Sequence, residues 1–194
     1  RISRKKYPNR FFFVYANTVA TIDFVKKFKG HGWMGIRFQT SVKDEYSEIS
    51  LHVRFKQNEA KLQQEVLGIM GVNLIYGAFY KHDEPLKMMR YLYDGIDKDA
   101  IEIDTINFNG PLFKEIDNRL ISLELVKLGM TDAVMFNKDG MNVLPAQVLY
   151  KKNILTLRGS FRPVTKVNEE MFKKSYEIFI KEKNVDPEDT IVIF

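Results

Sequence analysis

The chain lacks cysteine altogether, and its 194 residues include only three histidines. Without cysteine there is no disulfide scaffold, no cysteine-ligated zinc site and no thiol nucleophile. Three scattered histidines also argue against a histidine-rich metal site, so we predict no metal. No apolar run approaches the roughly 20 residues that a membrane helix needs. We therefore expect no membrane partner.

The composition that remains is globular, with a small basic excess. The chain is 45% apolar and 28% charged, and its formal net charge is +5. An apolar share of this size excludes intrinsic disorder. Five positive charges fall in residues 1–10, an arm with no signal-type apolar stretch behind it. Because no signal-type stretch follows the arm, we predict a cytoplasmic protein. Because the body beyond the arm is close to neutral, we do not expect nucleic acid as a partner.

The two ends suggest a piece of a longer protein. The chain does not begin with Met, and it stops in the apolar segment Thr190–Phe194. A natural terminus seldom lies inside a buried strand. We expect the chain to be a fragment.

The first half alternates strand and helix signals. Residues 11–15, 33–39 and 49–55 have the aromatic, β-branched or alternating patterns of strands. Apolar spacing predicts helices over 19–28 and 58–70, and glycines at their ends favour termination. The stretch 72–80 follows Gly71 and is interpreted as another strand. The order β-α-β-β-α-β is that of a ferredoxin-like unit.

The second half has a similar order after a connecting helix over 83–93. Its predicted helices cover 116–126 and 168–180, and its predicted strands cover 101–106, 133–136, 143–150, 154–157 and 190–194. We predict an α+β protein of two adjacent βαββαβ units. The alternative is one mixed α/β sheet with helices on both faces. The predicted parts are a basic arm (1–10), a first unit (11–80), a connecting helix (81–98) and a second unit (99–194).

One candidate ligand site lies at a predicted strand end in the second half. Arg158 and Arg162 flank Gly159 and Ser160, and Lys152 lies shortly before them. Arginine binds phosphate or carboxylate in a bidentate manner, serine offers a hydroxyl, and glycine permits close backbone approach. These residues are candidate anion ligands. The alternative is a structural loop whose arginines pair with carboxylates.

A second candidate lies where the predicted strand 101–106 meets a turn. Asp104 and Asn107 are candidate catalytic residues, because a carboxylate can serve as a base and an amide can orient a reacting group. Asn109 and Arg119 are candidate ligand-binding residues at the turn and the next helix start. The alternative is ordinary turn chemistry with a helix cap.

Histidines mark a third candidate. His31 lies between Gly30 and Gly32 beside the only tryptophan, Trp33, and could act as an acid–base group. The alternative is a helix stop before a strand. His52 lies on the same alternating polar face as Arg54.

Several stretches resemble the middle of an uncharacterised bacterial cytoplasmic family often labelled nicotinate-nucleotide adenylyltransferase or TonB-dependent receptor. They are Asn9–Asn17, Gly71–Ala78 and Leu149–Leu155, the last running into Arg158–Thr165. The resemblance covers nearly the whole chain. The His-x-Gly-His motif of such adenylyltransferases is absent, as Gly30-His31-Gly32-Trp33 has no second histidine. No catalytic residue is carried over from either label.

The combined expectation is a ligand-binding enzyme domain for an anionic metabolite that bears phosphate or carboxylate, nucleotides included. No cofactor follows from the sequence. The alternative is a non-catalytic regulatory or oligomerisation module of the ferredoxin-like type, and a homo-oligomer is expected in either case. Substrate and reaction stay open.

Overall fold

The computed structural model describes residues 5–22 and 29–194. It divides into two compact units, Arg1–Val143 and Leu144–Phe194, which are taken separately below. The predicted helix over 19–28 falls largely on residues 23–28, outside the described residues. In the described part of the chain, no helix is both long enough and apolar enough to cross a membrane.

Unit 1 is built on a four-stranded antiparallel sheet with strand order β1-β2-β3-β4. The strands are β1 (Phe13–Asn17), β2 (His31–Phe38), β3 (Ser47–Phe55) and β4 (Ile101–Asn109). Alternate residues of β2 and β3 are buried, which is the pattern of a sheet with one face on a core. The α+β class is thus confirmed.

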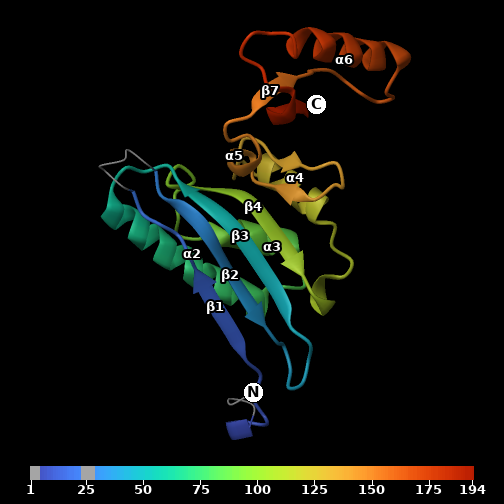
Figure 1. Cartoon of the computed structure of the whole chain (residues 1–194). Helices are drawn as coiled ribbons and strands as arrows, with labels where there is room; N and C mark the ends of the chain where they lie inside the picture. The colour runs from blue at the N-terminus through green and yellow to red at the C-terminus, as the bar shows by residue number, and fades with distance from the viewer. Residues whose placement is uncertain (1–4, 23–28) are drawn as a thin grey trace. The chain divides into compact units, whose positions relative to one another are not determined.

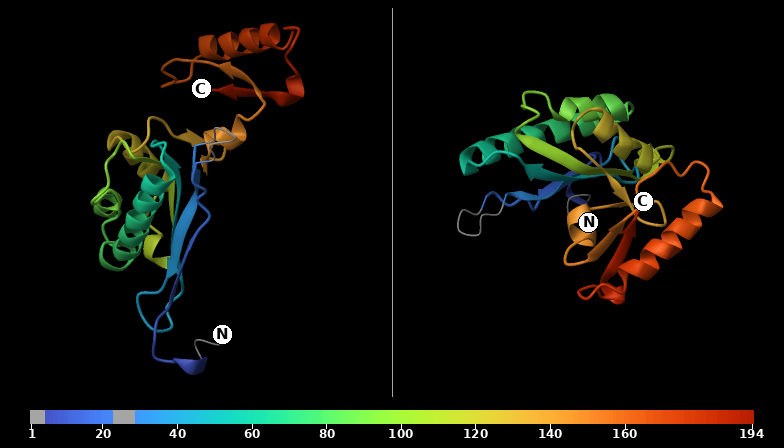
Figure 2. Two further views of the ribbon diagram at one scale, coloured as in Figure 1. Left: turned by 90° about the vertical axis from the view of Figure 1, so that its left-hand side faces the viewer. Right: turned by 90° about the horizontal axis from the view of Figure 1, so that it is seen from above.

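Two helices cover one face of this sheet, as Figures 1 and 2 show: α2 (Ala60–Tyr80) and α3 (Pro85–Leu92). The core lies between these layers. Its largest fully buried side chains are Met34, Ile36, Phe38, Ile49, Leu51, Phe55, Met70, Leu74, Met88, Met89, Leu92 and Phe108.

The predicted strand over 72–80 is wrong, because these residues continue α2. Met70, Leu74 and Ala78 recur at a spacing of four and are fully buried, so helical periodicity decides the packing. Gly71 does not end the helix. A side chain there would place its Cβ 2.7 Å from the Tyr15 hydroxyl, so glycine makes room for the Tyr15 ring.

The fourth strand of the sheet is therefore β4, from beyond the predicted domain boundary at 81–98. β4 pairs with β3 in an antiparallel register that runs from Glu48 opposite Asn109 to Phe55 opposite Ile101. The division between compact units falls after Val143 instead. The ferredoxin-like arrangement is not confirmed.

Smaller elements follow β4 within unit 1. They are η1 (Pro111–Phe113), α4 (Asn118–Lys127) and the hairpin β5 (Met135–Phe136) with β6 (Asn142–Val143). The Asn118 side chain donates to the carbonyl of Phe108 at 3.0 Å and accepts from its N–H at 2.8 Å. These bonds satisfy backbone groups on the outer edge of β4.

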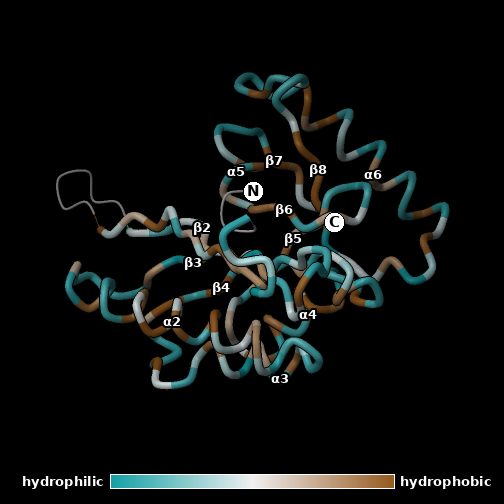
Figure 3. The backbone as a smooth tube through the Cα atoms, turned by 90° about the horizontal axis from the view of Figure 1, so that it is seen from below, coloured by the Kyte–Doolittle hydropathy of each residue, from teal (hydrophilic) through white to brown (hydrophobic). Residues whose placement is uncertain are grey.

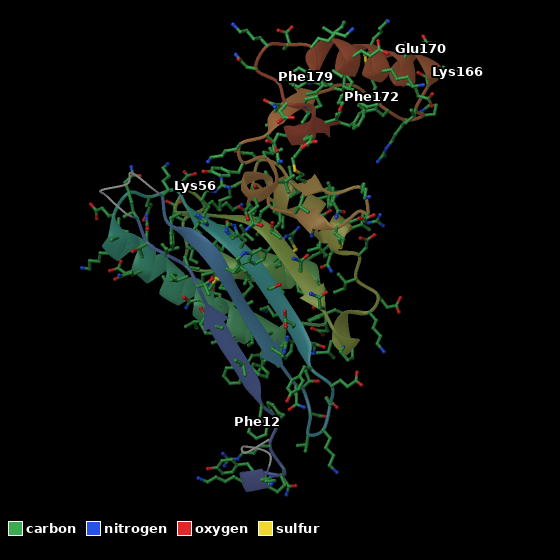
Figure 4. All side chains as sticks on the ribbon, in the orientation of Figure 1. Phe12, Lys56, Lys166, Glu170, Phe172 and Phe179 are labelled. Atoms are coloured by element: carbon green, nitrogen blue, oxygen red, sulfur yellow. The ribbon has the colours of Figure 1, made fainter. Side chains whose placement is uncertain are left out.

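Unit 2 pairs two parallel strands, β7 (Asn153–Thr156) and β8 (Thr190–Ile193), connected through α6 (Lys166–Phe179) and η2 (Pro187–Asp189). β8 is among the apolar segments of Figure 3. The ring of Phe172, which is labelled on α6 in Figure 4, lies 5.9 Å from the Phe194 ring between centroids. The predicted strand over 143–150 is wrong: Pro145 opens a short helix, α5 (Pro145–Val148), where its fixed φ is favourable.

Candidate functional site

The sheet of unit 1 has a polar face, which is the face opposite α2 and α3. Because side chains alternate along a strand, the residues between the buried ones of β2 and β3 point to this face. β2 contributes His31, Trp33, Gly35 and Arg37, and β3 contributes Glu48, Ser50, His52 and Arg54. The register sets Trp33 opposite His52 and Gly35 opposite Ser50.

A bulge brings Asp104 to this face. His52 pairs with Thr105, and Val53 pairs with Ile103, so Asp104 is an extra residue in β4. Bulges re-aim side chains and are common next to functional sites. The extra residue also keeps Ile103 and Ile106 in the core although they are three positions apart.

The centre of the polar face is a hydrogen-bonded pair between His52 and Asp104. His52 Nδ1 lies 2.8 Å from Asp104 Oδ1 and 3.0 Å from Oδ2. His52 is 5% exposed and Asp104 is 6% exposed. Arg54 donates to Asp104 Oδ2 at 3.3 Å and leaves 42% of its side chain exposed. The carboxylate thus has an imidazole on one side and a guanidinium on the other.

His31 and Trp33 enclose the other side of the His52 ring. His31 Nδ1 lies 3.1 Å from His52 Nε2, and the Trp33 ring meets the His52 ring edge-on at 5.3 Å. A carboxylate only accepts, so we assign the Nδ1 proton of His52 to the bond with Asp104. His52 Nε2 then accepts from His31 Nδ1. The three side chains form one chain of hydrogen bonds from Asp104 to His31.

Close backbone approach holds His31 in place. A Cβ on Gly32 would lie 2.6 Å from both the Thr18 carbonyl oxygen and Val19 Cα, and one on Gly30 would lie 2.4 Å from the Ala20 carbonyl oxygen. Thr18 and Ala20 donate backbone hydrogen bonds to Trp33 and His31. The two glycines around His31 are therefore required by packing.

The environment lowers the pKa of His31 below its ordinary value of 6.5. Burial is the largest cause, followed by the electrostatic effects of His52 and of the Arg54 guanidinium, while Asp104 acts in the opposite direction. Burial disfavours the charged imidazolium, and a nearby cation adds to that effect. His31 is accordingly neutral near pH 7.

This lowered pKa predicts acid sensitivity. In the unfolded chain His31 has its ordinary pKa, so the unfolded state binds the proton at a higher pH than the folded state. The stability due to neutral His31 is present above pH 6.5 and is lost as pH falls through the folded-state pKa. Urea unfolding from pH 7.5 to 5 measures the effect. We expect the wild-type protein to lose more stability than His31→Gln, whose amide can still donate to His52. If the free energies of unfolding of the two proteins fall by the same amount between pH 7.5 and 5, the lowered pKa of His31 is contradicted.

The structure places the other candidates of unit 1 outside this cluster. Asn107 accepts a hydrogen bond from Asn142 Nδ2 at 3.1 Å, and Asn109 is exposed at the end of β4. Arg119 donates to Asp117 at 2.7 Å, and this contact lowers the pKa of Asp117 to about 2. Asp117 also caps α4 by accepting from the backbone N–H of Arg119. Arg119 thus has a structural partner.

The remaining candidates belong to unit 2. Lys152 forms an ion pair with Asp189. Arg158, Ser160 and Arg162 are exposed in the coil between β7 and α6. In the part of the chain that the structure describes, neither Arg158 nor Arg162 forms an ion pair. Their role as anion ligands stays a prediction.

Asp104 is the one predicted catalytic residue that lies in the His31–His52–Asp104 cluster. Its partners in that cluster were not predicted together with it. His52 and Arg54 were placed on one polar face by their alternation, and His31 was a candidate by itself. The sequence contained no sign that the three converge on Asp104. Within residues 5–22 and 29–194, no group of three histidine or carboxylate side chains could hold a metal ion.

A shallow hollow lies on the same polar face and includes Gly35, two residues beyond Trp33 on β2. It has a volume of about 320 Å³ and is lined by Val14, Ala16, Gly35, Ile36, Arg37 and Glu48. Two of its lining residues, Ala16 and Gly35, are small and lie opposite each other in the register of β1 with β2. Two further lining residues form an ion pair: Arg37 donates to Glu48 Oε2 at 2.6 and 2.8 Å. The hollow therefore combines an apolar surface with two charged side chains.

No family model, no curated protein and no solved structure matches this chain.

Proposed function

We propose that the chain is a ligand-binding enzyme domain for an anionic metabolite, and that the ligand binds on the polar face of the sheet. The observation that carries this proposal is the buried chain of hydrogen bonds from Asp104 through His52 to His31, with Arg54 at its rim. Arg54 binds the anionic group in this proposal. The imidazole pair supplies the acid–base chemistry beside it.

The energetics of burial support a functional role. A buried ion pair recovers its desolvation cost only with excellent geometry, and well-packed apolar residues are often equally stable in its place. The polar face nevertheless buries a carboxylate and an imidazole between β2 and β4. Titratable groups whose pKa values are perturbed by burial and by specific partners cluster at functional sites. Asp104 acts here as the residue that orients His52.

The geometry also suits an anion. Arg54 makes one contact to Asp104 and keeps further N–H donors on the exposed part of its side chain. A guanidinium has five N–H donors arranged for bidentate binding of phosphate or carboxylate. On β2, Gly35 of the hollow lies four residues beyond His31, the register partner of Arg54, which is about 13 Å along the strand. A ligand of about this length can place its apolar body in the hollow and its anionic group at Arg54.

A thermal-shift screen against phosphorylated and carboxylated metabolites tests this proposal. A ligand that binds only the folded state adds about 2.7 kcal/mol of apparent stability at a hundred times its Kd. We expect at least one class to raise the melting temperature of the wild-type protein, Arg54→Gln to abolish this shift, and Lys61→Gln to preserve it. Lys61 is the control because it is exposed in the first turn of α2, outside the hollow of the polar face and a second hollow described below, and its substitution removes the same positive charge. A shift that survives Arg54→Gln would place the ligand elsewhere.

A flat screen would also count against the proposal. Combined with a mass that rises with protein concentration, it would favour the alternative, an oligomerisation module.

A further inference from the structure

A second hollow lies on unit 1, away from the polar face, where α2 ends and α3 begins. Its volume is about 450 Å³. Four cationic side chains and two tyrosines line it: Lys81, Lys87, Arg90, Lys98, Tyr91 and Tyr93. We call it the basic hollow. Asp94 is the one carboxylate among its described lining residues.

Most of the positive charge in the basic hollow lacks a carboxylate partner. Lys87 is paired with Glu84 at 2.5 Å. Among the residues that the structure describes, Lys81, Arg90 and Lys98 form no ion pair; Lys98 Nζ donates to the carbonyl of Leu128 at 3.2 Å. Like charges gathered around one hollow repel one another. An anion bound among them would relieve this repulsion and gain charge-assisted hydrogen bonds.

The wall of the hollow contains a tyrosine ring held in a stack. The Tyr91 and Tyr76 rings lie 5.0 Å apart at 35°, and Tyr80 extends the stack from Tyr76 at 4.6 Å. Lys81 Nζ lies 5.1 Å from the centre of the Tyr91 ring. Burial, and then the negative charge of Asp94, raise the pKa of Tyr91, so its phenol stays protonated. A flat, neutral aromatic surface therefore lies among the cations.

Buried hydrogen bonds fix the backbone of the hollow before any ligand binds. Asn73 Nδ2 donates to the carbonyls of Leu92 at 3.0 Å and Asp94 at 2.8 Å. The Tyr93 hydroxyl donates to the carbonyl of Ile101 at 2.9 Å. These bonds hold the end of α3 and the following turn against α2 and β4. Such preorganisation reduces the entropy that binding must overcome.

We propose that the basic hollow binds a phosphate-bearing ligand whose planar ring lies against Tyr91, a ligand of the mononucleotide class. Lys81, Arg90 and Lys98 bind the phosphate. Stacking on an aromatic side chain suits any nucleobase, because every base has a π-face. This site shares no residue with the polar face, so it holds whether or not an anion binds there.

Calorimetric titration with adenosine monophosphate and with ribose 5-phosphate tests both parts of the proposal. We expect both to bind, with the nucleotide about tenfold tighter because only it has a base to stack. The double variant Arg90→Gln/Lys98→Gln should weaken both ligands at least about tenfold, since each lost contact involves a charged donor. Tyr91→Leu should weaken the nucleotide alone.

The control is Lys61→Gln/Lys138→Gln, which removes the same charge from the first turn of α2 and from the β5–β6 turn. It should bind both ligands like the wild-type protein. Arg54→Gln should also bind them unchanged, which separates this proposal from the one for the polar face. Unaltered binding by the Arg90/Lys98 variant, or no binding of either ligand to the wild-type protein, would overturn the basic hollow as a phosphate site. Equal affinity for the two ligands would overturn the role of Tyr91.

Discussion

Asp104→Ala is expected to lower the free energy of unfolding by about 3–5 kcal/mol, the range for breaking a buried charged pair by removing one partner. The carboxylate accepts from His52 and from Arg54, and both His52 and Asp104 are almost fully buried. Without it, the Nδ1–H of His52 has no acceptor, and Arg54 faces the cluster with no counter-charge. The loss at His52 carries the penalty of an unsatisfied buried donor, whereas the half-exposed Arg54 can turn to water.

Urea unfolding at pH 7.5 measures the effect of Asp104→Ala. Asp139→Ala is the control, because Asp139 is exposed in the β5–β6 turn and its turn hydrogen bond is donated by its backbone N–H to Asn137 Oδ1. We expect the control to lie within about 0.5 kcal/mol of the wild-type protein. Asp104→Asn should lie between the two, since its amide oxygen can still accept from His52. A loss below 1 kcal/mol for Asp104→Ala would show that the pair is not buried as described.

Phe38→Ala is expected to lower the free energy of unfolding by a similar amount, about 3–5 kcal/mol. Phe38 is fully buried at the end of β2. Its ring contacts Phe79 of α2 at 5.6 Å and Phe113 of η1 at 6.3 Å between centroids. Truncation removes the transfer free energy of the ring and leaves a cavity among three elements that are distant in the sequence.

Thermal or urea unfolding of Phe38→Ala checks this expectation, with Tyr46→Ala as its control. Tyr46 is another aromatic residue of unit 1, but it is exposed just before β3. Its truncation should change stability little. Phe38→Leu should recover more than half of the loss, because leucine refills part of the volume. Equal effects for Phe38→Ala and Tyr46→Ala would contradict the placement of the core.

The elements with a strong local signal were predictable. The alternation of Ile49, Leu51, Val53 and Phe55 predicted β3. Residues 137–140 are Asn-Lys-Asp-Gly, a typical turn sequence between the predicted strands 133–136 and 143–150, and they form the β5–β6 turn. In both cases neighbouring residues determine the conformation, through the two-residue period of a strand and the chemistry of a tight turn. The same local logic placed His52 and Arg54 on one polar face.

The end of α2 was not predictable in this way. Residues 72–80 form a continuous apolar run after a glycine, a pattern shared by buried strands and buried helices. The choice depends on what the run packs against. Leu74 and Ala78 pack at helical spacing in the core, and Gly71 leaves room for Tyr15, a residue of the distant β1.

In the candidate site, too, local sequence signals were readable but the contacts between distant residues were not. His52 and Asp104 are 52 residues apart, and the register of β3 with β4 brings them together. A trace of the bulge is present in the sequence, because Ile101, Ile103, Ile106 and Phe108 can share one face only if one extra residue lies between 103 and 106. That spacing predicts a bulge but does not identify the partner strand.

The sequence by itself determined the α+β class, the local strands and hairpin, and the polar character of one sheet face, because these depend on periodicity and turn chemistry between near neighbours. The tertiary structure alone decided which histidine meets Asp104, where α2 ends, and that Lys81, Arg90 and Lys98 share one hollow with Tyr91. Those outcomes depend on strand register and on packing between distant segments, which the free energy of the whole fold selects.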